Sequence, residues 1–220
     1  MSDRAKSRDG DRSRDADRSR RLILGAAEEL FAEHGFDGVS LGQIAAAAEL
    51  SRGTPSYFFG SKEQLYRAVL EAAFEDREEA ARDACRPLVA WAGSDDGPSI
   101  EKPLAMAVAG YLDFLLSRAS FLKLIQREEL VGGSRLQDVP RESKAIEEAF
   151  SVVRSVAPKR GLKSFAVQDA VLVFIALTFF PLAQRSTFMA ALGKDLEEAR
   201  VRRRHVRLVT DQLLHLVGLN

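Results

Sequence analysis

The chain has 220 residues, of which 46% are hydrophobic and 29% charged, and its 32 basic and 32 acidic side chains give a formal net charge of zero. This composition is typical of a soluble globular protein with a sizeable core, and it argues against a wholly basic nucleic-acid binder. Cys85 is the only cysteine, so an intrachain disulfide and a cysteine-rich zinc site are excluded.

Targeting and membrane segments are not expected. The N-terminus lacks the apolar stretch of a signal peptide. Residues 170–183 form a run of 14 uncharged residues, short of the ~18 that a membrane span needs, and are interpreted as a buried helix. We therefore expect a cytoplasmic protein that contacts no membrane.

The first elements are a polar tail and a long helix. Residues 1–17 contain no large apolar residue except Met1, so we expect a disordered tail, either an arginine arm that follows a phosphate backbone or a solubilising segment. From residue 18 to 34, pairs of apolar residues recur every four positions, which predicts a helix. Gly35 is placed to end it in a left-handed conformation.

Helix-capping motifs then follow closely. Ser40 to Gln43 forms a capping box that opens a short alanine-rich helix over about 41–48, Ser51 is expected to cap a third helix of about two turns, and Ser61 to Gln64 repeats the box. Three caps within this short stretch are typical of helices joined by tight turns, as in a helix-turn-helix unit.

The remainder predicts an all-α protein of about nine helices. The fourth helix continues to residue 88 or 91, residues 92–99 form a loop, and further helices are expected near 100–118, 120–131, 140–157, 165–190 and 195–217. We divide the chain into a tail (1–17), a helix-turn-helix domain (18–65) and a larger helical domain (66–220).

The third helix carries the chemistry. Pro55 and Phe59 share one face, suited to packing, whereas Arg52 and Ser56 share another, with Gly53 and Tyr57 beside them. An arginine can make a bidentate bond to guanine in a major groove, where a glycine permits close approach. Tyr57, Ser40 and Lys62 would contact phosphates, the last two from helix N-termini.

The charge of this region limits how it could bind DNA. Residues 1–21 carry eight basic and five acidic residues, and residues 22–65 carry two and six, so the first 65 residues have a net charge of −1. Any DNA contact must therefore come from locally placed groups.

Residues 39–70, "VSLGQIAAAAELSRGTPSYFFGSKEQLYRAVL", resemble the DNA-binding signature of the tetracycline-repressor (TetR) family of bacterial regulators. The positions that match in order are Ser40, Ile44, Ala45, Ala48, Ser51, Gly53, Thr54, Tyr57, Phe59, Ser61, Lys62, Glu63 and Leu65. The chain departs from the family pattern at Glu49, where a turn glycine is usual, at Pro55 and Ser56, which replace a Leu-Tyr pair, and at Phe58, where histidine is common.

The resemblance implies a ligand-responsive repressor that binds a palindromic DNA operator as a homodimer and is released by a small apolar or amphipathic effector. The DNA-binding residues would be Ser40, Ser51, Arg52, Gly53, Thr54, Ser56, Tyr57 and Lys62, with Arg18, Arg20 and Arg21 as a possible backbone arm.

The last two helices are expected to form the dimer interface, and the larger domain to enclose an effector pocket. The interface candidates are Val171, Phe174, Val206, Val209, Leu213 and Leu216. The pocket candidates are Met106, Tyr111, Phe114, Phe121, Phe174 and Thr178. Both sets could instead be ordinary core.

Three alternatives stay open. The capped helices could be a corner of a larger helical domain, and the chain could be a helical ligand-binding or scaffold dimer that binds no DNA. An enzyme is disfavoured because no catalytic or phosphate-binding motif is found, and His34, His205 and His215 have no metal-ligand spacing. No cofactor or metal is expected.

Overall fold

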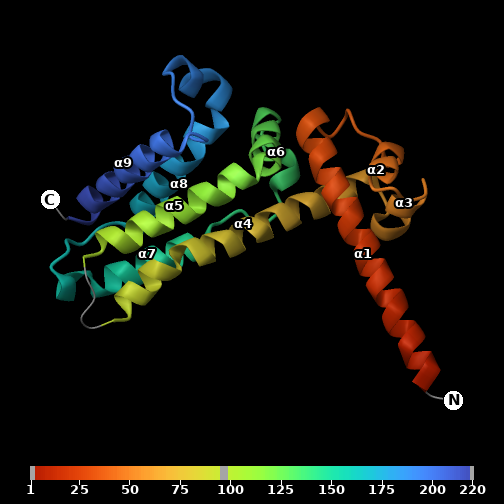
Figure 1. The fold of residues 1–220 in the computed structure, drawn as a ribbon, viewed down its shortest axis with the longest axis horizontal. Helices are drawn as coiled ribbons and strands as arrows, with labels where there is room; N and C mark the ends of the chain where they lie inside the picture. The colour runs from red at the N-terminus through yellow and green to blue at the C-terminus, as the bar shows by residue number, and fades with distance from the viewer. Residues whose placement is uncertain (1–2, 95–98, 219–220) are drawn as a thin grey trace. The chain divides into compact units, whose positions relative to one another are not determined.

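A computed structural model of the chain describes residues 3–94 and 99–218. In these ranges all regular structure is helical, with no strand, as the sequence predicts (Figure 1). The nine α-helices are α1 (Asp3–His34), α2 (Leu41–Ala47), α3 (Thr54–Phe59), α4 (Lys62–Ala92), α5 (Glu101–Ser117), α6 (Ala119–Leu130), α7 (Lys144–Val156), α8 (Val167–Ala183) and α9 (Ala199–Val217). Short 3-10 helices η1 (Ser134–Leu136) and η2 (Ala157–Arg160) and a π-helix η3 (Arg185–Met189) complete them.

The chain forms two compact units. The first comprises residues up to Ala73 together with Lys123–Pro140, and the second comprises Phe74–Leu122 together with Arg141–Asn220. The sequence predicts a single division after residue 65, which differs from this arrangement. Helix α4 continues from one unit into the other without a break in its helical sequence pattern. In addition, no local sequence signal marks residues 123–140 as a segment that returns to the first unit.

Helix α1 supplies the core of the first unit. Ile23, Ala27 and Phe31 lie four residues apart and are fully buried, as expected for one helical face. Gly35, with φ at +73°, ends the helix, and the ring of Phe36 stacks on that of Phe31 with 6.1 Å between centroids. The predicted glycine stop is confirmed.

The start of α1 differs from the sequence prediction. Residues 3–17 continue the helix, whereas the composition predicts a disordered tail; Met1 and Ser2 lie outside the described residues. Acidic residues precede basic ones by three or four positions, as in Asp15/Arg18 and Asp17/Arg21. This spacing stabilises an isolated helix, an effect that an argument from hydrophobicity alone omits.

Both predicted capping boxes are confirmed. The Gln43 side chain accepts a 2.8 Å hydrogen bond from the backbone N–H of Ser40, and Ser40 Oγ accepts one from the Gln43 N–H. The same reciprocal bonds join Ser61 and Gln64. These caps fix where α2 and α4 begin.

The segment 123–140 is tied to the first unit by charged groups. Arg127 Nε donates a 2.8 Å hydrogen bond to the carbonyl of Ala32, in the last turn of α1, and Lys123 forms an ion pair with Glu33 at 2.5 Å. The guanidinium of Arg135 lies 4.4 Å from the centre of the Phe36 ring. Carbonyls at a helix C-terminus have no intrahelical partner, so Arg127 satisfies a group that would otherwise need water.

In the second unit, α8 packs against α5, α7 and α9, and α5 also packs against α9 (Figure 1). Helix α7 buries one apolar face that includes Ile146, Phe150 and Val153. Contacting aromatic rings run through this core with centroid separations of 5.4 to 6.5 Å, namely Phe74, Phe121, Phe114, Tyr111, Phe174, Phe150 and Phe165 in order of contact.

Of the predicted loop at 92–99, residues 95–98 lie outside the described residues. Among the described helices, no single one is long and apolar enough to cross a membrane, and α5 with α6 meets that test only as a bent pair, by length and composition.

Candidate DNA-binding surface

The third helix is shorter than expected and begins later. It spans Thr54–Phe59, its N-cap is Gly53, and a proline occupies its first turn. Ser51 does not cap it, because the Ser51 hydroxyl instead lies 2.7 Å from that of Thr54. The proline, whose fixed φ suits the first helical turn, explains the later start.

The predicted division of α3 into two faces is confirmed. Pro55 and Phe59 are buried, while Arg52, Ser56 and Tyr57 are exposed, Tyr57 to 84%. The aromatic ring of Tyr57 is therefore largely in contact with solvent, although such rings are usually packed against other side chains. The exposed face therefore presents a cation, a hydroxyl and a phenol around Gly53, where the backbone carries no side chain.

The start of α2 lies close to this face. A Cβ placed on Gly42 would be 3.6 Å from Arg52 Nε and 3.9 Å from Ser40 Oγ. Two of the predicted DNA contacts, Ser40 and Arg52, thus lie close together although twelve positions apart in sequence. Both are ordinary van der Waals distances, so the Arg52 and Ser40 side chains lie beside Gly42.

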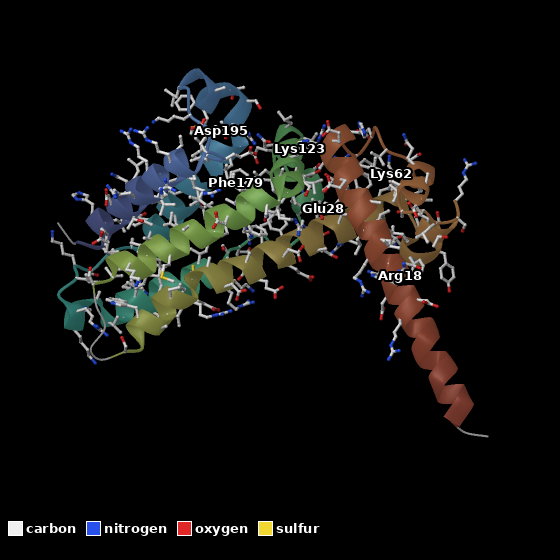
Figure 2. The ribbon with its side chains drawn as sticks, in the orientation of Figure 1. Arg18, Glu28, Lys62, Lys123, Phe179 and Asp195 are labelled. Carbon is white, nitrogen blue, oxygen red and sulfur yellow. The ribbon has the colours of Figure 1, made fainter. Side chains whose placement is uncertain are left out.

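Lys62, predicted to contact a phosphate, has partners within the protein. Its Nζ donates hydrogen bonds of 3.0 and 3.1 Å to the carbonyls of Phe36 and Val39 and lies 4.3 Å from the centre of the Phe36 ring. Figure 2 shows the lysine in the first unit. Two of its three donors are therefore used within the protein, where they join the turn between α1 and α2 to the start of α4. The predicted phosphate contact stays a prediction.

The three arginines of the predicted backbone arm have different surroundings. The guanidinium of Arg20 lies 4.4 Å from the centre of the Phe59 ring, so it supports the inner face of α3 by a cation–π contact. Arg18 (Figure 2) and Arg21 are exposed and line a hollow of about 730 Å³ between α1 and the end of α2.

Glu49 occupies the turn between α2 and α3. Its φ is +57°, and among the described non-glycine residues it alone has a positive φ. An L-residue in this conformation costs roughly 1–2 kcal/mol relative to glycine. The replacement of the family's usual turn glycine by Glu49 therefore strains the backbone at this position.

Residues 23–69 match the family model "Bacterial regulatory proteins, tetR family", and residues 101–213 match "Tetracyclin repressor-like, C-terminal domain". The chain belongs to the TetR family. With that assignment it is a DNA-binding transcriptional regulator and not an enzyme, and the resemblance found in residues 39–70 is confirmed.

Two relatives show the similarity of this TetR-family chain to bacterial regulators. The HTH-type transcriptional repressor NicS of Pseudomonas putida is 27% identical over 204 residues, covering 89% of this chain and 90% of NicS. The HTH-type transcriptional regulator RutR of Escherichia coli is 43% identical over 70 residues, covering 32% of this chain and 33% of RutR.

Solved structures show the same fold. A TetR-family transcriptional regulator of Mesorhizobium loti superposes with a TM-score of 0.69 at 20% identity, covering 92% of this chain and 98% of that one. The fatty acid degradation regulator FadR of Bacillus halodurans has a TM-score of 0.62 at 18% identity, with coverage of 89% and 94%.

The predicted pocket residues lie mainly in the aromatic core of the second unit. Tyr111, Phe121, Phe174 and Thr178 are buried, and Phe114 is half-buried. Met106 differs, because it is 50% exposed and lies on the opposite face of α5 from Tyr111. None of the six lines the hollow of about 370 Å³ between α5 and α9.

The predicted interface residues are partly wrong. Phe174, Val209 and Leu213 are fully buried within one protomer, so they cannot meet a partner, while Val171, Val206 and Leu216 are half-buried. Apolar spacing of three and four marks a packed stripe, but it does not distinguish the chain's own core from a subunit interface.

Sequence reasoning missed a buried polar group in the second unit. Arg77 and Ser143 are each 7% exposed, and Arg77 lies beside Glu78 on the inward stripe of α4. A signal was present, since these two charges interrupt an apolar stripe that includes Phe74, Ala81 and Cys85.

In the described part of the chain, no group of three or more His, Cys, Asp or Glu could hold a metal ion.

Proposed function

We propose that the protein is a repressor that binds a near-palindromic operator as a homodimer, acts in the cytoplasm and leaves DNA when a small effector binds its larger unit. The observation that carries this proposal is the exposed face of α3, with Arg52 beside Ser40 at the start of α2. An arginine there can make a bidentate bond to guanine in the major groove.

An exposed apolar surface supports the homodimer. Leu172 and Phe180 on α8 and Leu208 on α9 are 66%, 49% and 51% exposed. The ring of Phe180 contacts that of Phe188 at 5.7 Å, and Leu208 lines a hollow together with Leu192. A subunit interface on these two helices would cover the large apolar side chains that they expose.

The dimer is tested by charge substitution. Leu172→Glu with Leu208→Glu should convert the protein to a monomer, because it buries two unpaired carboxylates in an apolar interface. Leu130→Glu is the matched control, since Leu130 is 87% exposed on α6 and lies in the other unit. Molar mass is measured by light scattering; a double variant that stays dimeric would exclude this interface.

Sequence-specific DNA binding is tested by gel shift at one fixed salt concentration, with the DNA that flanks the protein's own gene. Arg52→Ala should weaken specific binding by about 1–3 kcal/mol, roughly a factor of 5 to 150. Arg86→Ala is the control, because Arg86 is exposed and pairs with Asp83 on its own helix. Equal shifts for wild type and Arg52→Ala would show that Arg52 reads no base.

A further inference from the structure

Three buried polar atoms in the second unit have no hydrogen-bond partner among the described residues. They are Nε of Arg77, Oε2 of Glu78 and Oγ of Ser143. Buried polar atoms are nearly always paired, since each loses its bonds to water on folding. Three such atoms within one small region call for an explanation.

The remaining atoms of these side chains already have structural partners. Arg77 donates 3.0 and 2.7 Å hydrogen bonds from its two Nη atoms to the carbonyls of Arg141 and Glu142. Glu78 Oε1 accepts a 2.7 Å bond from the N–H of Ala145, in the first turn of α7. Joining α4 to α7 therefore accounts for these atoms but not for the three that are unpaired.

Ser143 is the clearest case. It is the N-cap residue of α7, the position at which a serine hydroxyl normally accepts a backbone N–H, yet its side chain makes no cap bond. Glu78, from another helix, supplies that acceptor instead. The Ser143 hydroxyl is thus buried and has no structural task.

Aromatic rings adjoin this polar group. The Arg77 guanidinium lies 5.0 Å from the centre of the Phe74 ring, and Phe74 contacts Phe121 at 5.7 Å. From there the contacts continue through Phe114 to Tyr111. Aromatic rings together with a few polar atoms are the groups that commonly line a small-molecule site.

The polar atoms define the ligand. Arg77 Nε–H can only donate, Glu78 Oε2 can only accept, and Ser143 Oγ can do either. Arg77 Nη2 and Glu78 Oε2 are 3.7 Å apart, so the two charges offset each other. An uncharged ligand therefore adds no net charge to the buried site, whereas an anion would approach the Glu78 carboxylate.

We propose that Arg77, Glu78 and Ser143 are the polar anchors of the effector site, and that the effector is a small uncharged aromatic molecule with an adjacent hydrogen-bond donor and acceptor, as in an amide. The proposal rests on the proposed function, in which an effector binds this unit. The site lies on α4, which also provides Tyr66 in the first unit.

Benzamide is the probe, because it combines a flat ring with one N–H donor group and one carbonyl acceptor. Calorimetry on the full chain compares it with N,N-dimethylbenzamide, which has no donor, with benzoate, which is charged, and with toluene, which has no polar group. Benzamide should bind saturably, and the other three about tenfold more weakly or not at all, because each leaves Glu78 or Arg77 unpaired.

Ser143→Ala separates a ligand contact from a structural role. If the hydroxyl serves the ligand, the variant binds benzamide about threefold to tenfold more weakly, the size of one hydrogen bond, while the ligand-free melting temperature stays equal or rises. Thr210→Val is the control, because Thr210 is also buried but donates to the carbonyl of Val206 on its own helix. It should bind benzamide like the wild type.

The proposal is overturned if benzamide does not bind, if N,N-dimethylbenzamide binds equally well, or if Ser143→Ala keeps its affinity and melts at a lower temperature. A parallel gel shift keeps the two proposals distinct. If the protein binds DNA but not benzamide, only the proposed effector site is refuted. If the four ligands bind in the expected order but the protein binds no DNA, only the proposed function is refuted.

Discussion

The hydroxyl of Tyr66 donates a 2.7 Å hydrogen bond to Oε1 of Glu128, and the two residues are only 2% and 1% exposed. The bond joins α4 to α6 within the first unit. Burial and the adjacent carboxylate both raise the pKa of Tyr66, because they disfavour the phenolate. Arg135 is 3.8 Å from the same oxygen and provides the opposing charge.

Tyr66→Phe should therefore destabilise the protein by about 1–3 kcal/mol, because it removes the short bond to a buried carboxylate whose other oxygen has no partner among the described residues. Urea unfolding at fixed protein concentration measures the change, since a dimer's stability depends on concentration. Tyr57→Phe, at an 84% exposed site, should unfold like the wild type. Equal stability of the Tyr66 variant would mean that the bond contributes nothing net.

A substitution at Glu49 should raise the stability of the protein, in contrast to Tyr66→Phe. Glu49→Gly should stabilise the protein by about 1 kcal/mol, because glycine adopts the observed φ of +57° without the Cβ clash. Glu49→Ala is the matched control, since it removes the carboxylate but keeps the Cβ and should stabilise much less. If alanine and glycine raised the melting temperature equally, charge and not backbone strain would be the cause.

Local patterns were sufficient to predict most of the helix-turn-helix part of the first unit. The boxes at Ser40/Gln43 and Ser61/Gln64, the stop at Gly35 and the two faces of α3 all depend on residues within four positions of each other, and all are confirmed. Local sequence carries such information because caps and helical faces are themselves local.

What could not be predicted depends on distant contacts. Lys62 is bonded to carbonyls 26 and 23 positions away, and nothing near it in sequence distinguishes that role from a phosphate contact. Val209 and Leu213 have the spacing of an interface but face their own core. The pairing of Glu78 with the start of α7 spans 67 positions, beyond the range of any helical pattern.

Lys62 provides a direct test of its structural role. Lys62→Met should lower stability by about 1–2 kcal/mol, because two backbone carbonyls lose a charged donor and the Phe36 ring loses its cation. The slope of DNA affinity against salt concentration should stay as in the wild type. A phosphate contact would reduce that slope by about one, and such a reduction without loss of stability would restore the role predicted from sequence.

Stability should fall in alkaline solution because of two buried groups in the second unit. Burial, aided by the Glu78 charge, raises the pKa of the Cys85 thiol from 9.0 to about 12, and burial raises the pKa of Tyr111 from 10.0 to about 12. Both groups are neutral when protonated, so the folded state keeps protons that the unfolded state releases. Their contribution is fully present below the unfolded pKa values and is lost as pH rises from about 9 toward 12.

Cys85→Ala isolates the thiol's share of this loss. Each group weakens the fold by up to about 1.4 kcal/mol per pH unit between its two pKa values, so the variant should lose stability less steeply than the wild type above pH 9 and in parallel with it near pH 7. Urea unfolding at a series of pH values measures both slopes. A thiol reagent applied to the native wild type should leave Cys85 unmodified at pH 8, because the side chain is buried and protonated. Rapid native-state modification, or identical alkaline slopes for the two proteins, would contradict the assigned burial of the thiol.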